Sequence, residues 1–244
     1  LDEKYYTDYH QSAMEGKFNV ERGIELQKQI DKVSSDLNKE RMNFIRNNAD
    51  SRVAFDMAAS YFQDIFVTLT ADEIDELMAI FKPSWDGTKE FVDLEETALA
   101  SKKIAIGSKY TDVTLLDKKG DSVKLSDYIQ PDKYTLVEFW ATWCGPCRVE
   151  IPHLKHVYEE YKDKNFDIIN ISFDDTTEEW HKTMKEEGMT WTQLIDPQHF
   201  EGEAAKAYRI MGIPYSILLD PNGIIIGTDM RGAKLDLVIQ EKIQ

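Results

Sequence analysis

The spacing of hydrophobic residues along the chain changes near residue 103. Before that point apolar residues recur at intervals of three and four, which is typical of amphipathic helices. After it, short apolar runs of strand length alternate with helical stretches. The change predicts two units: an all-α region over residues 1–103, and an α/β domain over residues 104–244 with helices on the faces of a sheet.

The first region predicts four helices. A long helix carries an apolar stripe at spacings of four, three and four, formed by Leu26, Ile30, Val33 and Leu37, with Phe44 further along. Such a stripe requires a partner surface, which we expect the next helix to supply. The next helix, capped by Asp50 or Ser51, is apolar on nearly every side from Val53 to Phe66, which predicts a buried central helix.

The remaining two helices of this region have clear boundaries. Thr70 and Glu73 form a capping box before an apolar run, and the helix is expected to end at Pro83. Another helix lies around Phe91 to Leu99. No group of residues in this region suggests chemistry, so we expect a helical bundle that serves packing, partner docking or dimerisation.

The second region predicts a β-hairpin followed by strands and helices. The hairpin has its turn at 117–121, and the apolar strand runs lie at 134–140, 166–173, 215–220 and 223–228. Helical stretches lie near 146–162, 176–187, 199–208 and 234–242. This alternation favours a sheet with a parallel βαβ core, in which working residues follow the carboxyl ends of strands. Both cysteines of the chain directly follow the strand at 134–140.

Composition narrows the classes of function. The net charge is −16. Residues 1–103 have 13 basic and 21 acidic residues, and residues 104–244 have 16 basic and 24 acidic residues, so each part has a net charge of −8. An evenly negative protein repels phosphate backbones and anionic lipids, so nucleic acid is not an expected partner. No apolar run is long enough to span a membrane, and the first ten residues lack the pattern of a signal peptide. We expect a mature or trimmed chain whose address signal is not part of it.

Cys144 and Cys147 admit three interpretations: a structural staple, a metal site or a redox centre. A bridge between them closes only about four residues, worth roughly 2 kcal/mol in the chain-entropy model, which is too little for a main structural role. A zinc site would need His153 and His156 as further ligands. On one helix these side chains lie about 240° and 180° round from Cys147, so we expect surface histidines and no metal.

The redox interpretation has a physical basis. A helix that begins near Cys144 directs its free N–H groups and positive dipole end at that sulfur, which stabilises the thiolate. Cys144 is therefore the predicted nucleophile, and the more buried Cys147 the resolving thiol. Pro146 suits the start of a helix, and Gly145 leaves room for a partner backbone.

The motifs around these cysteines resemble those of the thioredoxin superfamily. "FWATWCGPC", the following "RVEIP", and "GIP" before a strand that ends in "LLDPNG" are similar to bacterial thiol-disulfide oxidoreductases of the TlpA and ResA type. The resemblance covers about residues 104–244, including the hairpin. It implies a thioredoxin-like fold, with a central mixed sheet, flanking helices and an N-terminal β-hairpin, preceded here by an all-α region.

The resemblance also implies site residues. Ile213–Pro214 would form a cis peptide that faces the disulfide and leaves the Ile213 backbone free to pair with a substrate, in a groove with Trp143, Gly145 and Pro146. Tyr215 stands where the family often has threonine. Trp143 has an alternative role in packing.

Two carboxylates are candidate proton acceptors for Cys147. Glu138 interrupts an apolar strand where thioredoxins carry a buried acid, and Glu150 lies three residues after Cys147 on its helix. Burial would raise their pKa values toward the working pH. The alternatives are a half-exposed strand residue for Glu138 and a surface acid paired with a Lys or Arg for Glu150.

The sequence thus predicts an enzyme that reduces protein disulfides through a mixed disulfide, with no cofactor beyond the Cys144–Cys147 pair. The resemblance implies a periplasmic or exported, membrane-anchored bacterial protein that receives electrons from a membrane thiol donor. Its clients would be apocytochromes in cytochrome c maturation, another oxidoreductase, or misoxidised proteins. Two other classes remain: a peroxiredoxin-like thiol peroxidase, and a binding protein with a vestigial redox centre.

Overall fold

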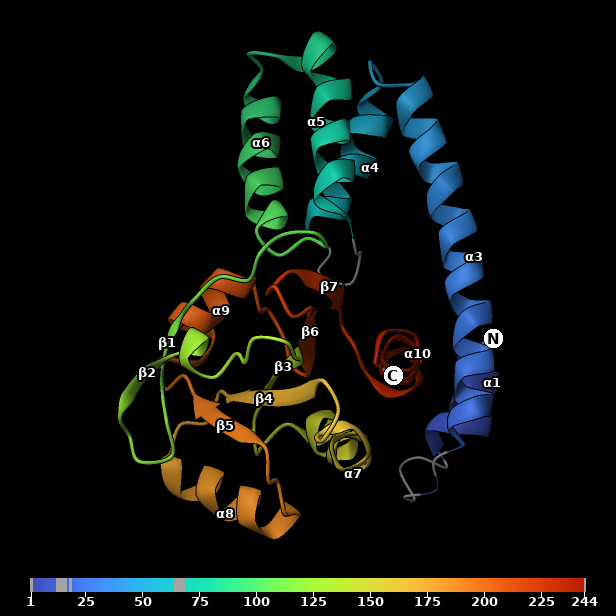
Figure 1. The fold of residues 1–244 in the computed structure, drawn as a ribbon. Helices are drawn as coiled ribbons and strands as arrows, with labels where there is room; N and C mark the ends of the chain where they lie inside the picture. The colour runs from blue at the N-terminus through green and yellow to red at the C-terminus, as the bar shows by residue number, and fades with distance from the viewer. Residues whose placement is uncertain (1, 12–16, 18, 64–68, 244) are drawn as a thin grey trace.

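The computed structural model describes residues 2–11, 17, 19–63 and 69–243. A seven-stranded mixed sheet with helices on both faces lies below the helices of residues 52–102, and the helix of residues 20–47 runs down beside it (Figure 1). The predicted order of an all-helical region followed by an α/β domain is therefore confirmed.

The sheet has the strand order β2-β1-β5-β4-β3-β6-β7. Its strands are β1 Thr114–Leu116, β2 Ser122–Lys124, β3 Tyr134–Trp140, β4 Phe166–Ser172, β5 Thr192–Ile195, β6 Tyr215–Leu219 and β7 Ile225–Thr228. β3, β4 and β5 are parallel, while the hairpin, β6 and β7 are antiparallel to their neighbours. The sequence did not predict β5, because its four residues, "TQLI", are too short and too polar to give a strand pattern.

Helices cover both faces of this sheet. α7 Gly145–Tyr161, α8 Thr177–Glu187 and α10 Gly232–Lys242 contribute to one apolar cluster, and α9 Glu203–Tyr208 to the other. The predicted helix at 199–208 is interrupted, with a 3-10 turn, η3 His199–Glu201, before α9. Along β3, Leu136 and Trp140 face α7, whereas Val137 and Phe139 face α9. Period-two alternation therefore puts Glu138 on the α7 face, with the cysteines.

The helices of the N-terminal region are α1 Asp2–Tyr5, the π-helical turn η1 Tyr6–His10, α3 Val20–Asn47, α4 Arg52–Gln63, α5 Ala71–Trp85 and α6 Lys89–Lys102. α4, α5, α6 and the end of α3 enclose one core. The capping box of Thr70 and Glu73 is present at the start of α5. The expected end of this helix at Pro83 is wrong: the helix continues to Trp85, since proline removes only one backbone donor near a helix end.

The expectation for α4 holds in part. Phe55, Ala58 and Phe62 are buried, but Val53 is exposed, and Ile65 and Phe66 lie outside the described residues. On α6, Leu99 is likewise exposed.

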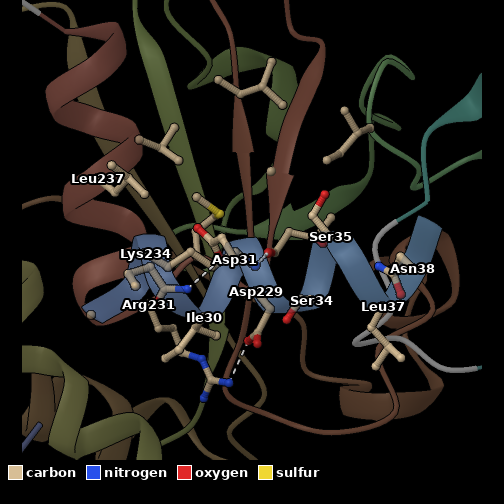
Figure 2. A pocket seen from close by; sticks show the side chains of 18 of the residues that line it. Ile30, Asp31, Ser34, Ser35, Leu37, Asn38, Asp229, Arg231, Lys234 and Leu237 are labelled. Carbon is tan, nitrogen blue, oxygen red and sulfur yellow. Dashed lines mark hydrogen bonds and ion pairs between the residues drawn. The ribbon is translucent and has the colours of Figure 1, made fainter. Parts of the chain in front are cut away.

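The apolar stripe of α3 does not find the continuous partner that the sequence predicted. Leu26 is buried, and the first half of the helix packs on α10. Further along, Val33, Leu37 and Phe44 are 56%, 48% and 40% exposed, because α3 leaves the sheet domain before it reaches α4 and α5. A cavity of about 1440 Å³ lies between α3 and the sheet domain (Figure 2). α3 lines one side of it, and β7, α10 and the start of α7 line the other.

Specific polar contacts join the helical region to the sheet domain. Arg209, at the end of α9, donates to the Phe62 carbonyl at 2.9 Å and to the Ser101 hydroxyl. The backbone of Ile106 pairs with Leu69 and Ala71. The predicted boundary at residue 103 stays a prediction, but these contacts tie the two regions together on both sides of it.

Candidate redox site

The cysteines lie at the start of α7, where the sequence predicted them. Cys144 is the N-cap residue, and its Sγ accepts the Cys147 N–H at 3.2 Å. The two sulfurs form a disulfide of 2.02 Å. Cys144 is 5% exposed and Cys147 1%. The N-cap position directs unpaired N–H groups at the Cys144 sulfur, which favours its thiolate after reduction.

The predicted groove residues lie around this disulfide at one edge of the sheet. Trp143, Gly145 and Pro146 are exposed, and space is open beside Gly145. Ile213–Pro214 is a cis peptide, as the resemblance implied. Because Tyr215 pairs with Phe139 near the carboxyl end of β3, the cis peptide lies at the same edge of the sheet as the cysteines.

Glu138 is a buried acid under the redox centre. It is 2% exposed, and its Oε2 has no hydrogen-bond partner among the residues that the structure describes. Desolvation, with repulsion from Glu150, raises the pKa of Glu138 to about 8. The alternative of a half-exposed strand residue is therefore wrong. A carboxyl group with this pKa exchanges a proton near neutral pH.

Glu150 is also buried, but its pKa moves the other way. Burial alone would raise the pKa, but hydrogen bonds from His153 Nδ1 at 2.8 Å and from the Gly232 N–H at 2.9 Å outweigh it, and the pKa is lowered. The expectation of a raised pKa is thus wrong for Glu150, because its neighbours stabilise the carboxylate.

His153 is the largest departure from expectation. It was expected on the surface, yet it is 3% exposed and lies between Glu150 and Asp236, with Nε2 at 2.9 Å from Asp236 Oδ1. Burial lowers its pKa, but the two carboxyl groups outweigh burial and raise it to about 10. A protonated imidazole donates to both. We call Glu150, His153 and Asp236 the buried charge cluster.

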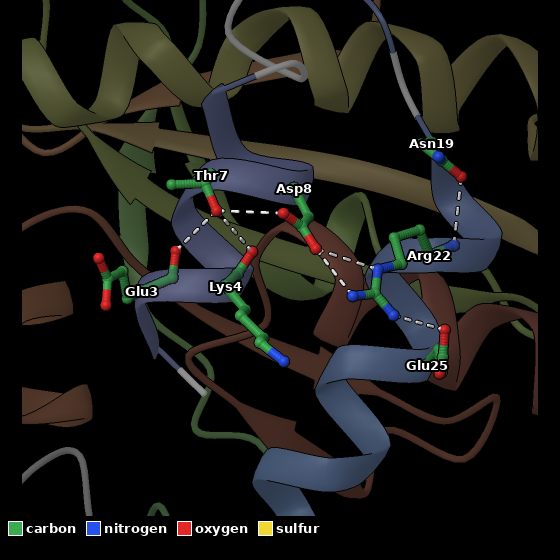
Figure 3. Close-up of polar contacts among 7 residues, drawn as sticks. All are labelled: Glu3, Lys4, Thr7, Asp8, Asn19, Arg22 and Glu25. Atoms are coloured by element: carbon green, nitrogen blue, oxygen red, sulfur yellow. Dashed lines mark hydrogen bonds and ion pairs between the residues drawn. The ribbon is translucent and has the colours of Figure 1, made fainter.

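The N-terminal segment completes this cluster. Tyr9 Oη donates to Asp236 Oδ2 at 2.8 Å, and Tyr5 Oη accepts the Ala233 N–H at 3.1 Å. An Arg22 ion pair with Asp8 of 2.7 Å holds the segment to the start of α3 (Figure 3). The helical region therefore contacts the buried charge cluster and the start of α10.

Sequence analysis expected His153 on the surface and did not identify Asp236 or Tyr9. A signal for His153 was present, since it lies three residues after Glu150 and four before Val157, both of which are buried on α7. Asp236 and Tyr9 had no such signal. Asp236 lies on α10, and Tyr9 lies near the start of the chain, 227 residues before Asp236. His156 is 40% exposed in its side chain, and among the described residues no group of acids, His and Cys is arranged to hold a metal ion.

A sheet with helices on both faces, a Cys-Gly-Pro-Cys helix start and a cis proline beside it together define a thioredoxin-like thiol-disulfide oxidoreductase. The model of the AhpC/TSA family matches residues 106–228, and the chain belongs to this family.

Relatives and solved structures agree on the class. The chain is 33% identical over 129 residues to the thiol-disulfide oxidoreductase ResA of Geobacillus kaustophilus, which covers 51% of this chain and 71% of the relative. It is 28% identical over 142 residues to ResA of Bacillus cereus, which covers 58% and 79%.

The thioredoxin domain of a Bacteroides vulgatus thiol-disulfide oxidoreductase matches at TM-score 0.52 and 35% identity, over 57% of this chain and 99% of that one. A Bacteroides fragilis thiol-disulfide oxidoreductase matches at TM-score 0.52 and 32% identity, over 55% and 98%. The resemblance and the fold class are thereby confirmed. The family match begins at residue 106, so the helical region lies outside it.

Proposed function

We propose that this chain reduces disulfide bonds in exported client proteins, using the Cys144–Cys147 pair and no bound cofactor. The observation that supports the proposal most is the difference between the two sulfurs: Cys144 caps α7 and accepts the Cys147 N–H, whereas Cys147 is the more buried. One sulfur is prepared to attack and the other to resolve.

In the reduced protein, the Cys144 thiolate attacks one sulfur of a client disulfide. The client S–S bond breaks, a mixed disulfide forms, and the first client sulfur leaves as a thiolate. Cys147 then loses its proton and attacks Cys144, which releases the second client sulfur and forms the Cys144–Cys147 disulfide. Two electrons pass to the client, and both client thiolates take up protons.

We assign Glu138 as the group that accepts the proton of Cys147. Its carboxylate form is available at and above its pKa of about 8, and within the described part of the chain its Oε2 makes no hydrogen bond. Glu150 would act through charge rather than proton transfer, because His153 and the Gly232 N–H hold it as a carboxylate. Its negative charge adds to the burial that raises the pKa of Glu138.

The oxidised form requires a dithiol donor to regenerate it. We assign this regeneration to a membrane thiol donor outside the cytoplasm. The likeness to ResA proteins also leads us to assign the chain to an exported, membrane-anchored protein. Among the described residues no helix has the length and apolar character to cross a membrane. The Gly-Pro pair between the cysteines, shared with thioredoxin, favours the reducing direction.

The reduction potential of the cysteine pair tests this direction. We expect a value near the −270 mV of thioredoxin, read by alkylation and Trp fluorescence against a thiol buffer, with reduction of insulin disulfides. A value near about −120 mV would reverse the electron flow and reject the reductase. Rapid peroxide consumption would favour a thiol peroxidase instead. Failure to reduce insulin would favour a binding protein.

A further inference from the structure

We propose that the cavity between α3 and the sheet domain binds an extended segment of the client protein whose disulfide Cys144 attacks. We call this cavity the α3 cleft. The inference rests on the proposed reductase function and extends it, since it makes the helical region part of the substrate-binding surface.

The α3 cleft is continuous with the redox site. Pro146, which separates the two cysteines, lines it, as do Val149 and Glu150 one turn further along α7. A client chain held at Cys144 therefore has a direct path into the cleft.

The wall on the sheet side suits an extended chain. Ile226, Gly227 and Thr228 of β7 line the cleft, and β7 is the last strand of the sheet. The outer edge of a terminal strand is where an extended peptide pairs with a sheet. Residues 107–109 pair with the start of this edge, through Ile224 and Ile225, and at its other end Lys234 Nζ donates to the Thr228 carbonyl at 2.8 Å.

The opposite wall is the part of α3 whose apolar stripe is exposed among the described residues, with Leu37 48% exposed. Ile30 and Leu37 line the cleft, with Ser34, Ser35 and Asn38 beside them (Figure 2). Mixed apolar and hydroxyl or amide groups fit a peptide, which presents both side chains and backbone. The volume of about 1440 Å³ also exceeds the roughly 300 to 1,000 Å³ of small-molecule pockets.

The charge of the cleft differs from that of the whole protein. Its lining has five basic and four acidic side chains, whereas the chain carries a net charge of −16. An acidic client segment is therefore repelled less in the cleft than on the rest of the surface.

Leu37→Gln and Val33→Gln form a matched test. Both residues are exposed apolar positions on α3, but only Leu37 lines the cleft. Each variant is assayed for reduction of two substrates: insulin with its disulfides intact, and the neutral small molecule 2-hydroxyethyl disulfide. We expect the ratio of kcat/KM for insulin to that for the small disulfide to fall about tenfold in Leu37→Gln, with Val33→Gln at the wild-type ratio.

The outcomes separate the two proposals. If the wild-type protein reduces neither substrate, the proposed function fails. If it reduces both and the two variants have the same ratio, the reductase stands and the cleft proposal fails. Gel filtration of all three proteins is the second measurement: a dimer that Leu37→Gln alone dissociates would show that the cleft binds a second copy, which also overturns the proposal.

Discussion

The helical region and the thioredoxin-like domain use their apolar residues differently. The domain packs two continuous clusters against the two faces of its sheet. Of the ten large apolar side chains that are exposed among the described residues, six belong to the helical region, although it is the shorter part. A sheet covered on both faces holds reacting groups in fixed positions, whereas exposed apolar helix faces are available for recognition.

The two regions also differ in where they place charge. Ion pairs of the helical region, such as Arg46 with Glu76 and Lys102 with Asp75, lie at the surface, where they contribute little. The domain instead buries Glu138 and the three residues of the buried charge cluster. Buried charge is costly unless it is paired, so this placement is the stronger sign of function. Four substitutions test the comparison.

His153→Gln should have the largest effect on stability. It removes the cation between Glu150 and Asp236, so that these two buried carboxyl groups lose the positive charge that they share. We expect a loss of about 3 to 5 kcal/mol in the free energy of unfolding at pH 6, measured by urea denaturation. The His153 pKa is raised, so its contribution is complete below the unfolded-state pKa of about 6.5 and is lost as pH rises through about 10.

His156→Gln, on the exposed side of the same helix, is the control and should change stability by less than about 0.5 kcal/mol. Equal losses in the two variants would show that the cluster is not a stabilising unit.

Glu138→Gln should remove a pH dependence. The folded-state pKa is raised to about 8 from 4.5, so the folded protein holds a proton that the unfolded chain releases, and stability falls as pH rises between these values. From pH 6 to 8 this amounts to about 2 kcal/mol, which should be absent in Glu138→Gln. Urea unfolding at each pH measures it, with Glu186→Gln on exposed α8 as the control. An identical pH slope in wild type and Glu138→Gln would contradict the assignment.

Arg209→Ala tests the junction between the regions. It removes the hydrogen bonds from Arg209 to Phe62 and Ser101, which should cost about 1.5 kcal/mol. We expect faster hydrogen exchange in α4 and α6, with little change in the cysteine reduction potential. Arg148→Ala, which loses an exposed pair with Glu187 inside the domain, is the control. If α4 and α6 exchange at the same rate in both variants, Arg209 does not hold the regions together.

Thr70→Ala should have the smallest effect. It removes the N-cap hydroxyl that accepts the Glu73 N–H, at a cost of about 1 kcal/mol. The loss should appear in unfolding of the helical region and leave the rate of insulin reduction near the wild-type value. Thr97→Ala is the control, because it also removes a hydroxyl group, on the surface of α6. A lower reduction rate in Thr70→Ala alone would mean that this cap supports the redox site directly.

The sequence by itself determined the local features of this protein. Strand and helix periods located β3, β4, β6 and most helices, and the capping box fixed the start of α5. The Cys-Gly-Pro-Cys spacing fixed the N-cap of α7, because a cap depends on residues adjacent in the chain. The motifs around it indicated the cis proline.

Only the tertiary structure decided what depends on distant segments. The partners of His153 come from α7 and α10, and Tyr9 closes the cluster from the first residues of the chain. The pKa of Glu150 fell rather than rose for the same reason, since burial is a property of the fold and the compensating donors come from its neighbours in space. The exposed half of the α3 stripe was equally unpredictable, because a hydrophobic face shows that a partner is needed and does not say whether it lies in the same chain.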